Sequence, residues 1–265
     1  DRVNATRPDP LVSLSLGRVR GRWAGHDGDG SDDGGAPVAV YRGLPYAKAP
    51  FGALRFQPPQ PVAPWPGERD AGAFGPAAPQ ASRQFELDDA LVGGPDCLTL
   101  NIWTPARPGE RLPVMVWIPG GGFMRGSAAD PLYDGAGFAR QGMVFVSLNY
   151  RLGVDGFMQM DGVAPNRGLL DQIAALRWVQ AHIESFGGDP SRVCVAGVSA
   201  GAGSVACLLA MPQADGPFQR AILQSPSVSC QTPVEAAQAA CAIAQQLGVA
   251  PTAQAMAGVP LHQAV

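Results

Sequence analysis

The chain has 265 residues, of which 46% are hydrophobic and 15% are charged, and its formal net charge is −3. A chain of this length can form one large globular domain or part of a larger one. No cluster of lysine or arginine stands out and no apolar stretch reaches ~18 residues, which argues against a nucleic-acid partner and against a membrane span.

The N-terminal third of the chain predicts antiparallel strands and loops. Two strand-like stretches, residues 17–23 and 37–47, flank an acidic, glycine-rich segment at 25–35 and predict a hairpin. The aspartates of that segment alternate as in a calcium loop, but the EF-hand spacing and its terminal glutamate are absent, so we interpret it as a solvated tip. Residues 50–96 are rich in proline, alanine and glycine and predict a long ordered loop. No signal peptide is visible, and because the chain starts at Asp1 rather than Met, a missing or processed N-terminus stays open.

Strands and helices alternate through the rest of the chain. The run from 168 to 186 has apolar residues at helical spacing. A second helix is predicted to begin at Thr232, which forms a capping box with Glu235, and to end at Gly248. The later strand-like runs are apolar on both faces, as buried parallel strands are. Antiparallel strands followed by strand–helix alternation predict an α/β layered sheet, with strands at 98–105, 113–120, 143–151, 191–199 and 220–226.

The cysteines and histidines indicate no metal site. The five cysteines are odd in number and include no C-x-x-C pair. We interpret Cys194, in a strand-like run, and Cys207, in a helix-like run, as small core residues. A disulfide between Cys230 and Cys241 stays open, and the cysteine usage leans toward a reducing, cytoplasmic compartment. Metal-ligand spacing is absent from the three histidines, His26, His182 and His262.

The stretch VCVAGVSAGAGSV, residues 193–205, carries the strongest chemical signal. Its apolar run ends in Gly-Val-Ser-Ala-Gly, and a helix-like pattern follows. Gly197 and Gly201 lack the Cβ atoms that would clash in a sharp strand-to-helix turn, and such a turn exposes the serine hydroxyl. The N-terminus of the following helix favours negative charge. Ser199 is therefore a candidate nucleophile, and the alternative is an ordinary strand-to-helix turn.

A second element, WIPGGGFMRG at residues 117–126, has three glycines after a buried strand. Alone, such a loop is equally consistent with a tight turn. Together with Ser199 it predicts an oxyanion hole, because backbone N–H groups must approach a developing oxyanion closely and glycine permits that approach. The predicted donors are the amides of Gly121, Gly122 and Ala200.

Six motifs follow one another along nearly all of the chain: YRGLPYAKAPFGALRFQPPQP (41–61), DCLTLNIWTP (96–105), LPVMVWIPGGGF (112–123), SLNYRLGVDGF (147–157), NRGLLDQIAALRWVQAHIESFGGDP (166–190) and VAGVSAGAGS (195–204). Together they resemble the type-B carboxylesterases, the α/β-hydrolase family that includes bacterial para-nitrobenzyl esterases and the cholinesterases. The resemblance implies a central, mostly parallel sheet with helices on both faces. It also implies hydrolysis of a small-molecule carboxylic ester through an acyl-serine intermediate, with no metal or organic cofactor.

Three positions depart from the family pattern. Pro119 stands where a histidine often precedes the three glycines, and it removes one N–H donor and stiffens the entry to the loop. Val198 stands where a glutamate often precedes the nucleophile, which argues against a cationic choline substrate. The family cysteine that would pair with Cys97 is expected near residues 75–80 and is absent, so that disulfide is not expected.

The catalytic partners of Ser199 are not recognisable in the chain. The family order is serine, acid, histidine. After Ser199 the only acids are Asp215 and Glu235 and the only histidine is His262, none of them in a matching motif. Glu235 is explained as a capping residue and His262 as a solvated one. We therefore expect residues 1–265 to be the N-terminal portion of a single α/β-hydrolase domain, truncated before the triad acid and histidine; a partial sequence, an engineered cut and a gene that lost its second half stay open as causes.

The leading functional hypothesis is a serine carboxylic ester hydrolase. On its own the chain is expected to show negligible turnover, and its last strand, 220–226, to be an uncovered apolar edge. The alternative is a non-catalytic adhesion or interaction member of the same fold, against which the intact GxSxG and GGG sequences argue. Thioester or amide hydrolysis by the same machinery stays open, as do the ester substrate and the oligomeric state.

Overall fold

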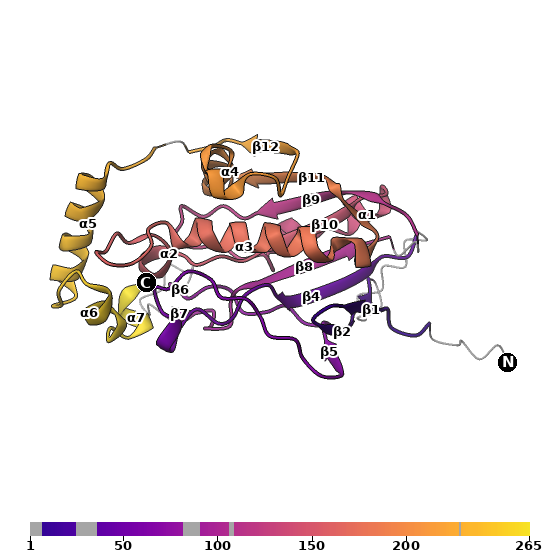
Figure 1. Cartoon of the computed structure of the whole chain (residues 1–265), viewed down its shortest axis with the longest axis horizontal. Coiled ribbons are helices and arrows are strands. Elements are labelled where there is room, and N and C mark those ends of the chain that lie inside the picture. The colour runs from indigo at the N-terminus through magenta and orange to yellow at the C-terminus, as the bar shows by residue number, and fades with distance from the viewer. Residues whose placement is uncertain (1–6, 25–35, 82–90, 106–108, 228) are drawn as a thin grey trace.

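The computed structural model describes residues 7–24, 36–81, 91–105, 109–227 and 229–265. Within those residues a seven-stranded main sheet lies at the centre of the molecule (Figure 1). From one edge to the other its strands are β12 (Arg220–Gln224), β11 (Gly188–Val198), β9 (Leu112–Ile118), β10 (Val144–Leu148), β8 (Thr99–Thr104), β4 (Ala39–Pro45) and β3 (Arg22–Trp23). The α-helices of the described ranges are α1 (Ala136–Arg140), α2 (Gly153–Phe157), α3 (Arg167–His182), α4 (Ala200–Ala210), α5 (Pro233–Gln246), α6 (Ala253–Ala257) and α7 (Leu261–Ala264).

The main sheet is mixed, and its parallel pairs are confined to one half. β12 pairs with β11, β11 with β9, and β9 with β10, each in parallel register. β8, β4 and β3 continue the sheet with antiparallel pairing. The four later strands predicted from the sequence, at 113–120, 143–151, 191–199 and 220–226, are therefore neighbours in one sheet. Of the antiparallel strands, β3 and β4 come from the N-terminal third of the chain, as expected, whereas β8 lies after it.

Burial decreases from the middle of the sheet to the β12 edge. Every residue of β8 and β10 is buried, whereas β9 alternates between buried and half-buried positions. β12 alternates between exposed and half-buried positions, and Ile222 on it is 42% exposed. The outer edge of β12 has no partner strand among the described residues. The predicted open, apolar edge is therefore present.

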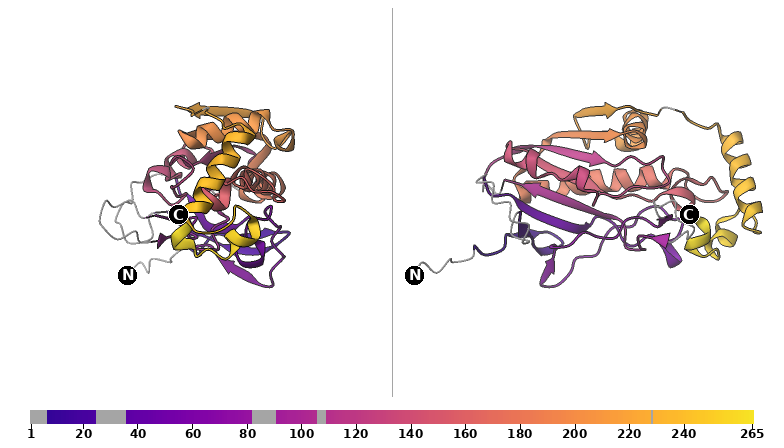
Figure 2. Two further views of the ribbon diagram at one scale, coloured as in Figure 1. Left: turned by 90° about the vertical axis from the view of Figure 1, so that its left-hand side faces the viewer. Right: turned by 180° about the vertical axis from the view of Figure 1, so that it is seen from behind.

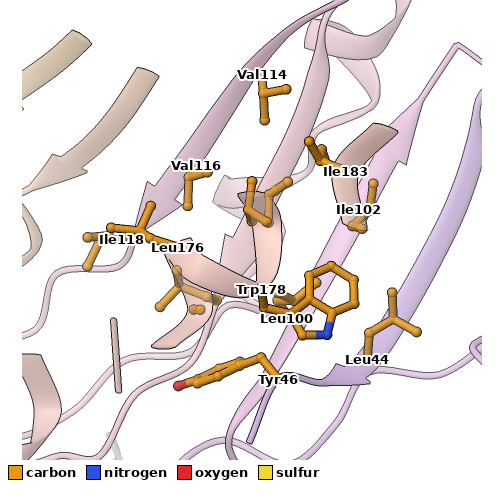
Figure 3. Packing of buried hydrophobic residues seen from close by; sticks show 14 of the residues in the cluster. Leu44, Tyr46, Leu100, Ile102, Val114, Val116, Ile118, Leu176, Trp178 and Ile183 are labelled. Carbon is orange, nitrogen blue, oxygen red and sulfur yellow. The ribbon is translucent and has the colours of Figure 1, made fainter. Parts of the chain in front are cut away.

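Helices cover both faces of the sheet. On one face, Leu176 of α3 packs in the same buried cluster as Val116 and Ile118 of β9 (Figure 3). On the other face, Ala139 of α1 packs with Phe145 of β10. These pairs use alternate strand positions, because successive side chains of a strand point to opposite faces.

Two smaller sheets lie beside the main one. One consists of β1, β2 and β5 and the other of β6 and β7, with bounds Leu11–Leu14, Gly17–Arg20, Glu68–Asp70, Gln80–Ala81 and Leu91–Val92. The strand predicted at 17–23 is therefore divided between two sheets. The break falls at Gly21, where a Cβ would lie 2.5 Å from the Val40 carbonyl oxygen. The predicted hairpin is present as β3–β4, and its acidic tip at 25–35 lies outside the described residues.

After β12 the chain forms α5, α6 and α7 at one end of the molecule, away from the main sheet (Figures 1 and 2). α5 begins with the predicted capping box: the Glu235 carboxylate accepts from the Thr232 amide at 2.7 Å, and the Thr232 hydroxyl accepts from the Glu235 amide at 3.3 Å. The three helices share a separate buried cluster with Phe56. Arg55 also binds these C-terminal helices to the rest of the molecule, because its guanidinium donates a hydrogen bond to the Val259 carbonyl oxygen at 2.6 Å.

All five cysteines are free thiols. Cys97 is fully buried, and burial raises the pKa of its thiol, so it stays protonated. Cys194 and Cys207 are half-buried on β11 and α4, which means that the prediction of two core residues is only partly right. Cys230 and Cys241 are exposed and form no disulfide. In the described ranges no helix is long and apolar enough to cross a membrane.

Candidate active site

Ser199 lies at the predicted strand-to-helix turn. It directly follows the last residue of β11 and is the N-cap of α4. Its backbone has φ 54° and ψ −120°, a region that residues with a side chain rarely adopt. Its side chain is exposed. The turn thus holds an exposed hydroxyl in a strained conformation, as the GxSxG sequence predicts.

Two glycines make this turn possible. A Cβ on Gly197 would lie 2.5 Å from the Gly201 carbonyl carbon, and a Cβ on Gly201 would overlap the Ile118 carbonyl oxygen. Both obstacles are backbone atoms, which cannot turn aside as a flexible side chain does. Because Gly201 contacts the last residue of β9, α4 begins directly against the strand that leads into the glycine loop.

The glycine loop lies against Ser199. A Cβ on Gly120 would lie 2.7 Å from the Val198 carbonyl oxygen and 3.3 Å from the Ser199 Cβ. Gly121 and Gly122 have φ values of 124° and 65°, which glycine adopts without strain. The structure therefore brings together the two elements that the sequence analysis singled out, although they lie far apart along the chain.

The predicted oxyanion donors are unused within the described chain. No described residue accepts a hydrogen bond from the amide N–H of Gly121, Gly122 or Ala200. By contrast, the amide of Ser199 donates to the Gln224 carbonyl oxygen at 2.9 Å. Ala200 is the first residue of α4, where unpaired N–H groups and the helix dipole favour a negatively charged ligand. The convergence of the three N–H groups on one point stays a prediction.

Tyr150 and Gln80 hold the glycine loop in place. The Tyr150 hydroxyl donates to the Pro119 carbonyl oxygen at 3.0 Å, and burial raises the pKa of Tyr150, which keeps this donor protonated. Gln80 accepts from the Gly126 amide at 2.8 Å and donates to the Gly126 carbonyl oxygen at 2.9 Å. Neither residue is predictable from a local pattern, because each acts on a loop far from it in the sequence. The only local signal of Gln80 is its polar side chain in a stretch rich in proline and alanine, and Tyr150 stands between the polar residues Asn149 and Arg151.

A buried ion pair fixes the segment that carries Tyr150. Arg151 and Asp171 are both fully buried, and two hydrogen bonds of 2.8 Å and 2.6 Å join the guanidinium to the carboxylate. Asp171 lies on α3 and also accepts from the Arg151 amide at 3.1 Å. The pair therefore ties the chain after β10 to α3, and Tyr150 transmits that support to Pro119.

No hydrogen bond joins Ser199 to a histidine among the described residues. His182 is half-buried at the end of α3, with its ring centroid 4.7 Å from that of Trp178, and burial lowers the pKa of its imidazole. His262 is exposed on α7, as expected, and His26 lies outside the described residues. No group of three or more histidine, cysteine or acidic side chains that could hold a metal ion gathers in the described ranges.

Comparison with known proteins identifies the family. Residues 8–261 match the model of the carboxylesterase family. The chain belongs to this family. This carboxylesterase chain is 44% identical over 246 residues to the para-nitrobenzyl esterase of Bacillus subtilis (strain 168), and the aligned region covers 90% of the chain and 48% of that protein. It is 45% identical over 201 residues to the fumonisin B1 esterase of Sphingopyxis macrogoltabida, and the aligned region covers 72% of the chain and 37% of that protein.

Solved carboxylesterases have the same fold as this chain. One PNB esterase structure superimposes with a TM-score of 0.84 at 41% identity, covering 97% of the chain and 53% of that protein. The carboxylesterase of Geobacillus stearothermophilus superimposes with a TM-score of 0.83 at 40% identity, covering 96% of the chain and 51% of that protein. The expected α/β-hydrolase fold is therefore confirmed. The carboxylesterase chain spans about half the length of these solved relatives.

Proposed function

We propose that this carboxylesterase chain supplies the nucleophile and the oxyanion-binding groups of a serine carboxylic ester hydrolase. The observation that carries the proposal is the exposed Ser199 in its strained turn, with the glycine loop packed against it. Family membership supports the same conclusion, since the named relatives include a para-nitrobenzyl esterase and a fumonisin B1 esterase. The proposed substrate is a small-molecule carboxylic ester.

In the proposed mechanism, the Ser199 Oγ attacks the carbonyl carbon of the ester and passes its proton to a histidine base. The carbonyl oxygen becomes an oxyanion that accepts hydrogen bonds from the amides of Gly121, Gly122 and Ala200. Each such donor is worth roughly 3 kcal/mol of transition-state stabilisation. Collapse of the tetrahedral intermediate expels the alcohol, which takes up the proton from the histidine and leaves an acyl-serine. Water, activated by the same histidine, then releases the carboxylic acid and regenerates Ser199.

The base and its orienting carboxylate come, in this proposal, from outside residues 1–265. His182 and His262 lie on α3 and α7, and neither is hydrogen-bonded to Ser199. The outer edge of β12 has no partner strand in the described chain, and further polypeptide would join the sheet by pairing there. A serine without a base stays a neutral hydroxyl and is a poor nucleophile.

The test is hydrolysis of a short-chain nitrophenyl ester by residues 1–265, alone and together with the unmatched second half of the Bacillus subtilis relative. We expect negligible turnover by residues 1–265 alone, because losing the base of a comparable triad costs about 10⁶-fold in rate. Addition of the second half should restore turnover, and Ser199→Ala should abolish it. Ser204→Ala is a matched control, since Ser204 is a buried serine of the same helix whose hydroxyl accepts from Gln172 at 3.1 Å.

Two results would contradict the proposal in different ways. Robust, Ser199-dependent turnover by residues 1–265 alone would refute the external base. Restored turnover that survives Ser199→Ala would refute the assignment of the nucleophile.

A further inference from the structure

A cavity of about 440 Å³ lies beside α3, and none of its lining residues belongs to the Ser199 turn or to the glycine loop. We call it the α3 pocket. Side chains of α3, including Ala174 and Trp178, line it, and so does the proline-rich segment 58–62. Tyr46 also lines the pocket, and Figure 3 shows the side chains of Tyr46 and Trp178. Cavities of this volume are typical of sites for small organic molecules.

The walls of the α3 pocket are pre-formed. α3 is tied down through the buried Asp171–Arg151 pair, and Trp178 is buried on its inner side. The segment 58–62 contains three prolines, whose fixed φ angles limit its freedom, and its Gln60 carbonyl accepts from the Lys48 amide at 2.8 Å. A rigid apolar pocket binds a ligand without first losing conformational entropy.

A few polar side chains, among them Arg177 and His182, interrupt this apolar lining. The Arg177 guanidinium donates one hydrogen bond, to the Gln213 carbonyl oxygen at 2.9 Å, and forms no ion pair among the described residues. A guanidinium has five N–H donors, so most of those of Arg177 are available to a ligand. His182 also lines the pocket, and its ring packs against that of Trp178.

We propose that the α3 pocket is a second ligand site that binds a small organic carboxylate, with its apolar body against Trp178 and its carboxylate on the Arg177 guanidinium. Charge decides the ligand class: the lining offers one unpaired cation and no acidic side chain. An organic cation is therefore disfavoured, and a neutral alcohol leaves the Arg177 guanidinium without an anionic partner. An inorganic anion would match Arg177 but would leave the apolar walls unfilled. Arginine and a carboxylate also fit each other as a two-pronged pair.

The experiment measures binding of decanoate to the purified protein by titration calorimetry, with 1-decanol as the uncharged ligand of equal chain length. We expect one decanoate per chain, bound about tenfold more tightly than decanol, as one charge-assisted contact at an exposed arginine implies. Arg177→Gln should remove that tenfold preference. Arg192→Gln is the matched control, because Arg192 is also an exposed arginine with a single hydrogen bond, to the Arg111 carbonyl oxygen.

Two further variants decide where the ligand binds. Ala174→Phe places a ring inside the α3 pocket and should abolish binding of both ligands. Ser199→Ala removes the proposed ester-cleaving nucleophile and should leave decanoate binding unchanged, so the site can be tested whatever the outcome for ester hydrolysis. Decanol binding as tightly as decanoate, undiminished binding to Ala174→Phe, equal losses in Arg177→Gln and Arg192→Gln, or loss of binding in Ser199→Ala would each overturn the proposal.

Discussion

Replacing Gly201 with alanine tests how α4 packs behind the candidate nucleophile. The added Cβ would overlap the Ile118 carbonyl oxygen and lie 2.9 Å from the Pro119 carbonyl oxygen, whereas ordinary contact begins at 3.4 Å. All of these neighbours are backbone atoms at the end of a central strand, so either α4 or β9 must move. Overpacking of this severity costs about 3 kcal/mol. The better helix propensity of alanine offsets about 1 kcal/mol of that cost, which leaves a net destabilisation of about 2 kcal/mol.

Gly137→Ala is the matched control for this substitution. Gly137 lies on α1 and is exposed, and a Cβ added to it would have no heavy atom within 4 Å, so alanine there should stabilise by up to about 1 kcal/mol. Both variants are compared with the parent by thermal and urea unfolding, followed by circular dichroism. For a chain of this size we expect Gly201→Ala to lower Tm by about 4–8 °C. If it raises Tm as Gly137→Ala does, α4 does not contact Ile118 as described, and the packing that joins the turn to the glycine loop is wrong.

Three other substitutions test the site and its support. Ser199→Gly should be about 1 kcal/mol more stable to urea than Ser199→Ala, because glycine removes the strain of a positive φ; equal stabilities would argue against the strained turn. Asp171→Ala should cost about 3–5 kcal/mol in urea unfolding, because it leaves the Arg151 charge buried without its partner; a loss below about 1 kcal/mol would contradict the pairing. Burial lowers the pKa of His182 from its ordinary 6.5, so the neutral imidazole contributes stability above that pH which is lost as the pH falls. His182→Gln should therefore lose less stability than the parent between about pH 7.5 and pH 5.5. If the unfolding free energies of the two proteins change with pH in the same way, His182 does not contribute this pH-dependent stability.

The parts of the fold that were predictable are those encoded by local patterns. The strands β9, β10 and β12 and the second half of β11 are short, mainly apolar runs, and the Ser199 turn is encoded by glycines on either side of it. The same reasoning identified α3 from its helical spacing and α5 from the capping box at Thr232. Each of these signals lies within a few residues of the structure that it specifies.

The parts that were not predictable depend on contacts between distant segments. The strand predicted at 17–23 is split because Gly21 passes close to Val40, and only the assembled sheet creates that contact. Gln80 clamps Gly126 across 46 residues of chain, which no local pattern records. α1 is five residues long, too short for a periodic apolar pattern to stand out. The boundary between the parallel and antiparallel halves of the sheet likewise depends on strand order, which is a tertiary property.

The hydrogen bond from the Ser199 amide to the Gln224 carbonyl oxygen ties the candidate nucleophile to the outermost strand of the sheet. β12 has a single strand neighbour in the described chain, so its backbone opens at a lower free energy than that of β9 or β10. Each opening releases the Ser199 amide to solvent, where its proton exchanges with deuterium. The exchange rate of this one amide therefore measures how often β12 separates from the Ser199 turn. Any polypeptide that pairs with the free side of β12 will slow that exchange, and the conformation of Ser199 will become more rigid as the sheet grows.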